Sequence, residues 1–196
     1  MKRKILSIIT AVSMIISLIV LPQMAGAATT HTHRLCNNAA CTDSSHNHTN
    51  YTFTAWTSTD SLPDEVGSYY LTDDVTLSNG WTVPNGTTNL CLNGHSVTMT
   101  DSNYAITMTS ASRVLNLCDC SASSSGKITH TADTTGRGVY NNYGTFNMYG
   151  GSVTGNTSAT GNSGAGVYTG SGGTFNMYGG SVTNNTATNT GGGVFI

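Results

Sequence analysis

Two cysteines and four histidines lie within one short polar segment near the N-terminus, in the order H-x-H-x2-C-x4-C-x4-H-x-H. Zinc prefers four ligands drawn from thiolate and imidazole groups, and two cysteines with two histidines supply that set. So short and polar a segment cannot build a core of its own, and packing therefore does not explain the density of these residues. We predict a structural zinc site here, and no other cofactor. The predicted ligands are Cys36, Cys41, His46 and His48, with His31 and His33 as alternates.

Two other interpretations of this segment stay open. The spacing differs from ordinary zinc fingers, in which the cysteines are closer together and a longer arm precedes the histidines. In an oxidising exterior, Cys36 and Cys41 could form a disulfide among flexible surface histidines. The third interpretation is a disordered tail.

Three further cysteines lie in the repetitive part of the chain. Cys91 and Cys118 occupy equivalent positions, and Cys120 follows two residues later. Stacked cysteines of this kind are interpreted as small apolar fillers. A disulfide between Cys91 and Cys118 is the alternative, although its fixed geometry is hard to satisfy between parallel neighbours.

The composition indicates the class of structure that must position these residues. Thr, Ser and Asn together account for 74 of the 196 residues, whereas only 8% of the chain is charged. Exposed helix faces are normally built from Glu, Lys, Arg, Gln and Ala, so an ordinary helical protein is excluded. The recurring β-branched and aromatic residues predict an all-β chain rich in turns.

The first 27 residues have the pattern of a secretory signal peptide. Lys2, Arg3 and Lys4 precede an apolar stretch, and Ala25-Gly26-Ala27 forms a small-x-small cleavage site. Its removal would leave four basic and nine acidic residues, a net charge of about −5. Scattered basic residues in an acidic chain argue against a nucleic-acid partner. We expect a secreted protein, at the cell surface, without a membrane span after cleavage.

Internal repetition is the strongest signal in the sequence. The segment GTFNMYGGSVT spans residues 144–154 and recurs identically at residues 173–183, an offset of 29. Each repeat holds three short strand patterns, and the turns between them absorb differences in length. This organisation predicts strands stacked on their equivalents in the next repeat. One resulting column contains Asn89, Asn116, Asn147 and Asn176.

Period-two alternation assigns the faces of these strands. Phe146 and Phe175 are expected to stack inside, and the asparagine column to form hydrogen bonds along the outer face. The pairs Gly150-Gly151 and Gly179-Gly180 are expected at sharp corners with positive φ.

The segments GVYNNYGTFNMYGGSVTGNT, GGGVF and LCLNGHSVTM resemble the repeats of right-handed parallel β-helix (pectin-lyase-like) proteins, secreted and surface proteins of Gram-positive gut bacteria. The resemblance covers roughly residues 51–196. It implies a three-sided coil whose first turn is capped by an N-terminal segment. It implies less about function, because this scaffold is used by adhesins, stalks and polysaccharide enzymes alike.

The expected organisation has four parts: a signal peptide at 1–27, a Cys/His-rich segment at 28–50, a cap with the first strands at 51–87, and β-helix repeats at 88–196. The last repeat stops at Ile196 without a capping element. We therefore expect a β-solenoid truncated at its C-terminus.

We expect a structural or adhesive module that binds a glycan or a host or cell-surface protein. The expected contact residues are Tyr149 and Tyr178 with Asn147 and Asn176, because aromatic faces and amides suit sugars. The alternative is the N-terminal part of a polysaccharide lyase or glycoside hydrolase with catalytic rungs downstream. No catalytic residue is assigned, because Asp101, Asp119 and Asp133 do not share one column.

Overall fold

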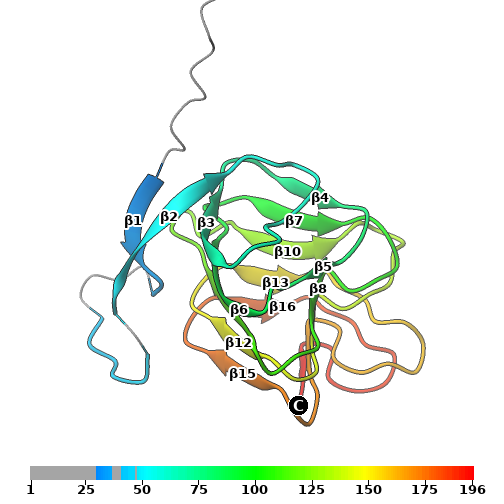
Figure 1. Cartoon of the computed structure of the whole chain (residues 1–196). Helices are drawn as coiled ribbons and strands as arrows, with labels where there is room; N and C mark the ends of the chain where they lie inside the picture. The colour runs from blue at the N-terminus through cyan, green and yellow to red at the C-terminus, as the bar shows by residue number, and fades with distance from the viewer. Residues whose placement is uncertain (1–29, 37–40, 47) are drawn as a thin grey trace, which may run out of the picture.

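The computed structural model describes residues 30–36, 41–46 and 48–196, so the expected signal peptide lies outside the described residues. Every regular element within these ranges is a strand, as the composition predicts. No helix in this part of the chain is long and apolar enough to cross a membrane. The strands form one sheet of seven strands and two sheets of five (Figure 1).

The three sheets contain the following strands. Sheet A consists of β1 (Thr30–Arg34), β2 (Asn50–Trp56), β3 (Gly67–Leu71), β6 (Gly86–Cys91), β9 (Arg113–Cys118), β12 (Thr145–Met148) and β15 (Thr174–Met177). Sheet B consists of β4 (Val75–Leu77), β7 (Ser96–Met99), β10 (Lys127–His130), β13 (Ser152–Thr154) and β16 (Ser181–Thr183). Sheet C consists of β5 (Trp81–Thr82), β8 (Ile106–Met108), β11 (Val139–Asn141), β14 (Val167–Thr169) and β17 (Val194–Phe195).

From β3 onward the chain visits sheets A, B and C in turn and then repeats the order. Apart from the edge strands, each of these strands pairs in parallel with the strand before it and the strand after it in the same sheet. Phe146 is the register partner of Phe175, and their rings stack with centroids 5.2 Å apart. The predicted stacking of residues 29 positions apart is therefore confirmed.

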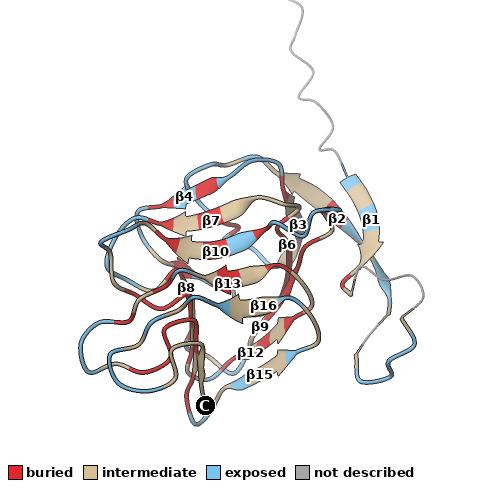
Figure 2. Cartoon of the chain, turned by 180° about the vertical axis from the view of Figure 1, so that it is seen from behind, coloured by how far each residue is buried: buried red, intermediate tan, exposed pale blue. Residues whose placement is uncertain are grey.

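The space between the three sheets is filled by one apolar core, visible as the buried strand residues of Figure 2. Phe146 is fully buried there, beside its register partner Leu115. Phe175 is only partly buried, and Met177 is 47% exposed, because β15 is the edge strand of sheet A. The inward-facing side chains of sheet A therefore become less buried from β12 to the edge strand β15.

The glycine pairs lie at corners between sheets A and B, but the two members of each pair have different roles. Gly151 and Gly180 have φ values of +77° and +81°, as predicted. The same prediction is wrong for Gly150 and Gly179, which are not among the positive-φ residues. A Cβ atom on Gly179 would lie 2.5 Å from the Tyr149 carbonyl oxygen, so close approach of the backbones requires glycine there.

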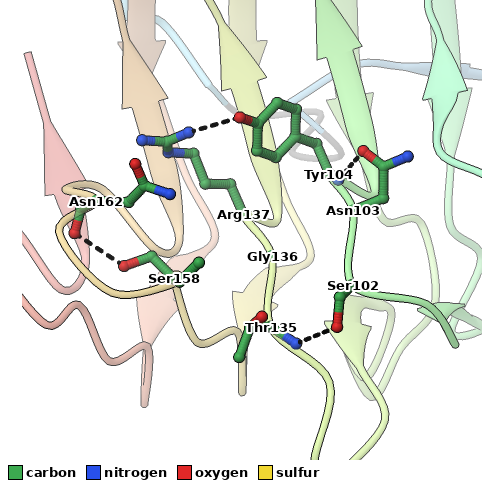
Figure 3. A pocket seen from close by; sticks show the side chains of 9 residues that line it. Ser102, Asn103, Tyr104, Thr135, Gly136, Arg137, Ser158 and Asn162 are labelled. Atoms are coloured by element: carbon green, nitrogen blue, oxygen red, sulfur yellow. Dashed lines mark hydrogen bonds between the residues drawn. The ribbon is translucent and has the colours of Figure 1, made fainter.

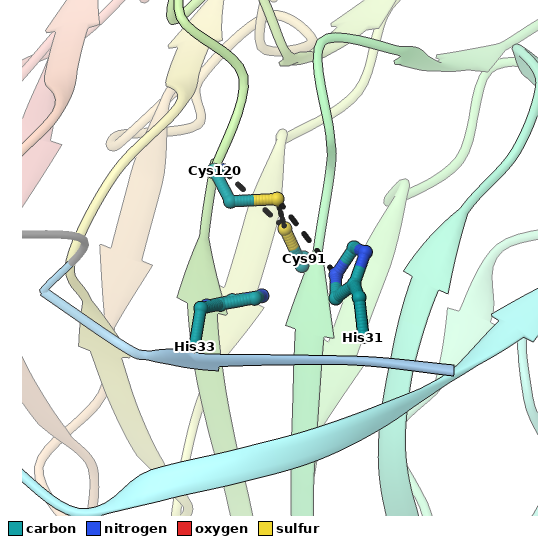
Figure 4. A group of neighbouring side chains, drawn as sticks. All are labelled: His31, His33, Cys91 and Cys120. Atoms are coloured by element: carbon teal, nitrogen blue, oxygen red, sulfur yellow. Dashed lines mark hydrogen bonds between the residues drawn. The ribbon is translucent and has the colours of Figure 1, made fainter.

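An antiparallel hairpin of β1 and β2 precedes the repeating part. Only the end of β2 pairs with β3, at Thr54 to Trp56. The rest of the hairpin crosses the parallel strands that form the remainder of sheet A, as Figure 4 shows. A second apolar cluster fills this contact, with Leu35 and Phe53 from the hairpin side and Cys91 and Cys118 from sheet A. Cys91 and Cys118 are thus buried apolar residues, and no disulfide joins any of the five cysteines, all of which are described.

The segment between β2 and β3 lies against the first turn of the sheets. Leu62 is 5% exposed and belongs to the main core. The Trp81 indole donates a hydrogen bond to the Pro63 carbonyl at 2.8 Å, and the Trp56 indole donates one to the Ser61 carbonyl at 2.7 Å. These contacts attach the segment to the start of the core.

Candidate functional sites

The four predicted zinc ligands come together in one loop between β1 and β2. We call them the loop group: Cys36, Cys41, His46 and His48. Their ligand atoms all lie within 4.8 Å of one another. A cluster of two sulfur and two imidazole nitrogen atoms of this size could hold a metal ion. The alternates His31 and His33 are not part of this group.

Two distances inside the loop group agree with those of a tetrahedral metal site. The Nε2 atoms of His46 and His48 are 3.3 Å apart, and Cys41 Sγ lies 3.5 Å from His46 Nε2. Zinc bonded at ordinary lengths would separate two nitrogen ligands by about 3.3 Å and a nitrogen from a sulfur by about 3.6 Å. Two imidazole nitrogens this close must share a proton or a cation.

Further polar groups hold the outer nitrogen of His46. Its Nδ1 lies 3.5 Å from Ser45 Oγ and 3.8 Å from an oxygen of Asp43. The Ser45 backbone N–H donates to the other Asp43 oxygen at 2.9 Å, and this bond is the main cause of the lowered pKa of Asp43. An ionised carboxylate beside the outer nitrogen is the usual second partner of a metal-bound histidine.

His46 of the loop group packs against the two tyrosines that were predicted as ligand contacts. Tyr149 and Tyr178 stack with ring centroids 4.9 Å apart, and the His46 ring lies 5.4 Å from Tyr149 and 4.9 Å from Tyr178. Burial, followed by the neighbouring Tyr178, raises the pKa of Tyr149 to about 12. The His46 side chain is itself only 3% exposed. These tyrosines therefore contact the N-terminal loop, and their predicted role toward an external ligand remains a prediction.

The asparagine column forms a continuous ladder of hydrogen bonds. Asn116 donates to Asn89 at 2.7 Å, Asn147 donates to Asn116 at 2.8 Å, and Asn176 donates to Asn147 at 2.8 Å. These bonds confirm the predicted stacking of side-chain amides. Asn89 and Asn116 are 4% and 7% exposed. The ladder thus uses amide groups of Asn147 and Asn176 that the sequence suggested for an external ligand.

A second surface feature lies on sheet C, where aromatic rings stack along the outside. Tyr104, Tyr140, Tyr168 and Phe195 follow one another with centroids 4.5, 5.2 and 5.4 Å apart. Beside this stack lies a pocket of about 240 Å³, shown in Figure 3. Its lining includes the polar residues Ser102, Asn103, Thr135, Ser158 and Asn162.

Arg137 connects the pocket with the aromatic stack. Its guanidinium lies 4.5 Å from the centre of the Tyr168 ring and between 5.2 and 5.3 Å from those of Tyr104 and Tyr140. It donates hydrogen bonds to the Ser163 carbonyl at 2.9 Å and to the Tyr104 hydroxyl at 3.1 Å. The residue is 6% exposed, and within the described residues no carboxylate forms an ion pair with it.

The aspartates considered for catalysis have separate environments. Asp119 is 4% exposed and accepts hydrogen bonds from the backbone N–H groups of Gly94, Ser121 and Gly126. Asp101 and Asp133 are exposed. Asp119 therefore joins the turns of two successive repeats. In the described part of the chain, no carboxylate belongs to a cluster of three or more metal-ligating groups.

Comparison with protein-family models, curated proteins and solved structures gives no match for this chain. The resemblance to pectin-lyase-like repeats therefore remains a prediction from the quoted segments. The sequence contained a signal for the sheet C stack that we did not use. The dipeptide Val-Tyr occurs at residues 139–140 and again at residues 167–168, and the structure pairs the two copies residue by residue in β11 and β14.

Proposed function

We propose that the repeating part is a right-handed parallel β-helix that serves outside the cell as a structural and adhesive module. The cyclic order of sheets A, B and C supports the coil. The right-handed sense follows from the strong preference of parallel crossover connections for that hand. The secretory location rests on the sequence of residues 1–27 alone.

We propose that the module binds an acidic polysaccharide at the pocket on sheet C. The observation that carries this proposal is Arg137, a nearly buried cation without a carboxylate partner among the described residues, beside stacked tyrosines and a polar pocket. Aromatic faces pack against sugar rings, hydroxyl and amide groups bond sugar hydroxyls, and a guanidinium pairs with a sugar carboxylate. We propose a binding role for this pocket and assign no catalytic residue in it.

The test compares two variants that each remove one positive charge. Arg137→Gln changes the pocket, whereas Lys127→Gln changes an exposed cation on β10 of sheet B. Binding to polygalacturonate and to a neutral glucan is measured by affinity electrophoresis. We expect retention by polygalacturonate only, with at least a tenfold loss for Arg137→Gln and little change for Lys127→Gln.

A second pocket variant, Asn162→Ala, keeps the test meaningful if Arg137→Gln disturbs the fold. It should also weaken retention while circular dichroism remains that of the native protein. Equal losses in the two charge variants, or no retention of the native protein by polygalacturonate, would contradict the proposed site.

We further propose that the loop group binds a structural zinc ion. The short Nε2–Nε2 distance of 3.3 Å between His46 and His48 supports this, since a shared cation removes the repulsion between their lone pairs. The ion would hold the loop over Tyr149 and Tyr178.

The measurement is the zinc content of the purified protein with and without Cys36→Ser/Cys41→Ser. Loss of one zinc ion per chain in the double variant is expected, and Cys118→Ala serves as the control because Cys118 belongs to neither metal-ligating cluster. A Cys36–Cys41 disulfide, or a zinc content unaffected by the double variant, would contradict the site.

A further inference from the structure

A second cluster of two cysteines and two histidines lies where the hairpin crosses sheet A. We call it the junction group: His31, His33, Cys91 and Cys120. Both histidines come from β1, Cys91 ends β6, and Cys120 follows β9 by two residues. Their ligand atoms lie within 4.8 Å of one another (Figure 4). His31 and His33 are two positions apart on one strand, so both side chains face the same side.

His33 is oriented as metal-bound histidines usually are. Its Nδ1 lies 2.8 Å from the Arg34 carbonyl oxygen, which can only accept a hydrogen bond, so Nδ1 carries the proton. Its Nε2 therefore carries a lone pair. That atom is buried, and it has no hydrogen-bond partner among the described residues. A buried lone pair without a partner costs free energy, and a cation at the cluster would remove this cost.

Aromatic neighbours fix both imidazole rings. His33 stacks on Phe53 with centroids 4.0 Å apart and an angle of 7° between the planes. His31 stacks on Tyr70 with centroids 3.9 Å apart. Phe53 is fully buried, so its ring holds His33 in place. The two nitrogen ligands are thus positioned before any ion binds.

The sulfur atoms complete the set from the other side. Cys91 is fully buried, and its Sγ accepts a hydrogen bond from the Cys120 backbone N–H at 3.3 Å. The two Sγ atoms are 2.9 Å apart, and Cys120 Sγ is 3.9 Å from His31 Nε2. Two tetrahedral sulfur ligands of zinc lie about 3.8 Å apart. Cys120 is only partly buried and lies outside the strands, two residues after β9, so its side chain can move by the required ångström.

We propose that the junction group is a second structural zinc site, which fastens the N-terminal hairpin to sheet A. The set of two thiolates and two imidazoles suits zinc in preference to the hard cations calcium and magnesium. A two-stranded hairpin is marginally stable in water by itself, and this one is joined to the rest of sheet A by the pairing of Thr54 to Trp56 with β3 and by the apolar cluster around Leu35 and Phe53. Zinc bonds from β1 to the ends of β6 and β9 stabilise this arrangement.

The test counts metal ions in the full chain, purified under reducing conditions and loaded with zinc. The native protein should hold two zinc ions, and Cys36→Ser/Cys41→Ser should retain one. Adding Cys120→Ser to that background should remove the last ion, whereas adding Cys118→Ala should not. Cys118 is the matched control because it is a buried cysteine of the same apolar cluster but not of the junction group.

Cobalt loading gives a second readout, because tetrahedral cobalt bound by two thiolates has intense visible bands and a charge-transfer band in the near ultraviolet. In the Cys36→Ser/Cys41→Ser background these bands should persist, and His31→Asn should abolish or shift them. Circular dichroism on every variant separates loss of metal from loss of fold.

Three results would overturn the junction site: no zinc in the Cys36→Ser/Cys41→Ser background, zinc retained after Cys120→Ser, or a Cys91–Cys120 disulfide in protein purified without reductant. Failure of the loop site gives a different pattern, namely one zinc ion in the native protein that Cys36→Ser/Cys41→Ser does not remove.

Discussion

Two regions of the molecule are stabilised in different ways. They are the repeating body, residues 67–196, and the N-terminal arm, which runs from β1 to β2. In the body, every inner strand pairs with two equivalents, and the same core position recurs from turn to turn. In the arm, β1 pairs with β2 alone, and Leu35 and Phe53 supply its apolar contact with sheet A.

This difference shows how each region can tolerate change. The body depends on buried surface and on hydrogen bonds that repeat in each turn, so its stability is a sum over many similar contacts. The arm has few such contacts, but it carries the four residues of the loop group and the two histidines of the junction group. We therefore expect core substitutions to affect the body, and metal removal to affect the arm.

The largest effect is expected from shortening a core side chain of the body. Phe146→Ala removes a fully buried ring between Leu115 and Phe175 and should lower the free energy of unfolding by about 3–5 kcal/mol. Phe175→Ala is the matched control, because Phe175 is only partly buried and should cost less. Urea unfolding followed by circular dichroism measures both values. Equal losses would mean that burial does not increase toward the middle of the body.

The next effect concerns the turns of the body. Asp119→Asn places an amide N–H₂ or a less basic oxygen opposite the N–H groups of Gly94 and Gly126 and should cost about 2–3 kcal/mol. Asp133→Asn, at an exposed aspartate, should change stability by less than about 0.5 kcal/mol. Urea unfolding checks both variants. A zinc content that falls in Asp119→Asn would show that the arm depends on these turns, contrary to the comparison.

Metal removal is expected to have a smaller effect, and that effect should be confined to the arm. A chelator should increase proteolytic cleavage within residues 30–50 and leave fragments of the body intact, because the body holds neither complete set of ligands. Limited proteolysis with mass spectrometry locates the cuts. Cleavage that is unchanged by chelator, or that spreads through the body, would contradict separate stabilisation of the two regions.

The smallest effect is expected from a surface aspartate of the body. Asp74 accepts a hydrogen bond from the Ser96 backbone N–H at 2.7 Å, and this bond is the main cause of its lowered pKa. A lowered pKa stabilises the folded protein above the ordinary value of 3.8, and this contribution is lost as the pH falls through the folded-state pKa.

Asp74→Asn should therefore be less stable than the native protein at pH 7, by less than about 1 kcal/mol because the side chain is 66% exposed. Urea unfolding at pH 7 and at roughly pH 3 should show this difference shrinking at the lower pH. A difference that grows at low pH would mean that the carboxylate is not stabilised by the Ser96 N–H. Cleavage of the arm should be the same in both proteins.

The repeating body could be predicted from the sequence because the same contacts recur wherever the sequence repeats. The identical segments at residues 144–154 and 173–183 gave the register of β12 and β15 residue by residue, and the asparagine ladder followed from it. The loop group could also be predicted, because its four ligands lie within 13 residues of one another.

The junction group could not be predicted in this way. His31 and His33 meet Cys91 and Cys120 only because the hairpin crosses the outer face of sheet A, and no periodicity in the sequence encodes that crossing. The sheet C pocket was missed for a similar reason. Arg137 and Tyr104 come from different turns, and their contact depends on how the loops before β8 and β11 pack.

The position of His46 on Tyr149 and Tyr178 has a consequence for biosynthesis. A ribosome makes the arm before the body, yet the surface that receives His46 is completed more than a hundred residues later. The cysteines and histidines of the loop therefore cannot reach their final positions until several repeats of the body have assembled. The arm is translated before the body, yet it is among the last parts to reach its final place.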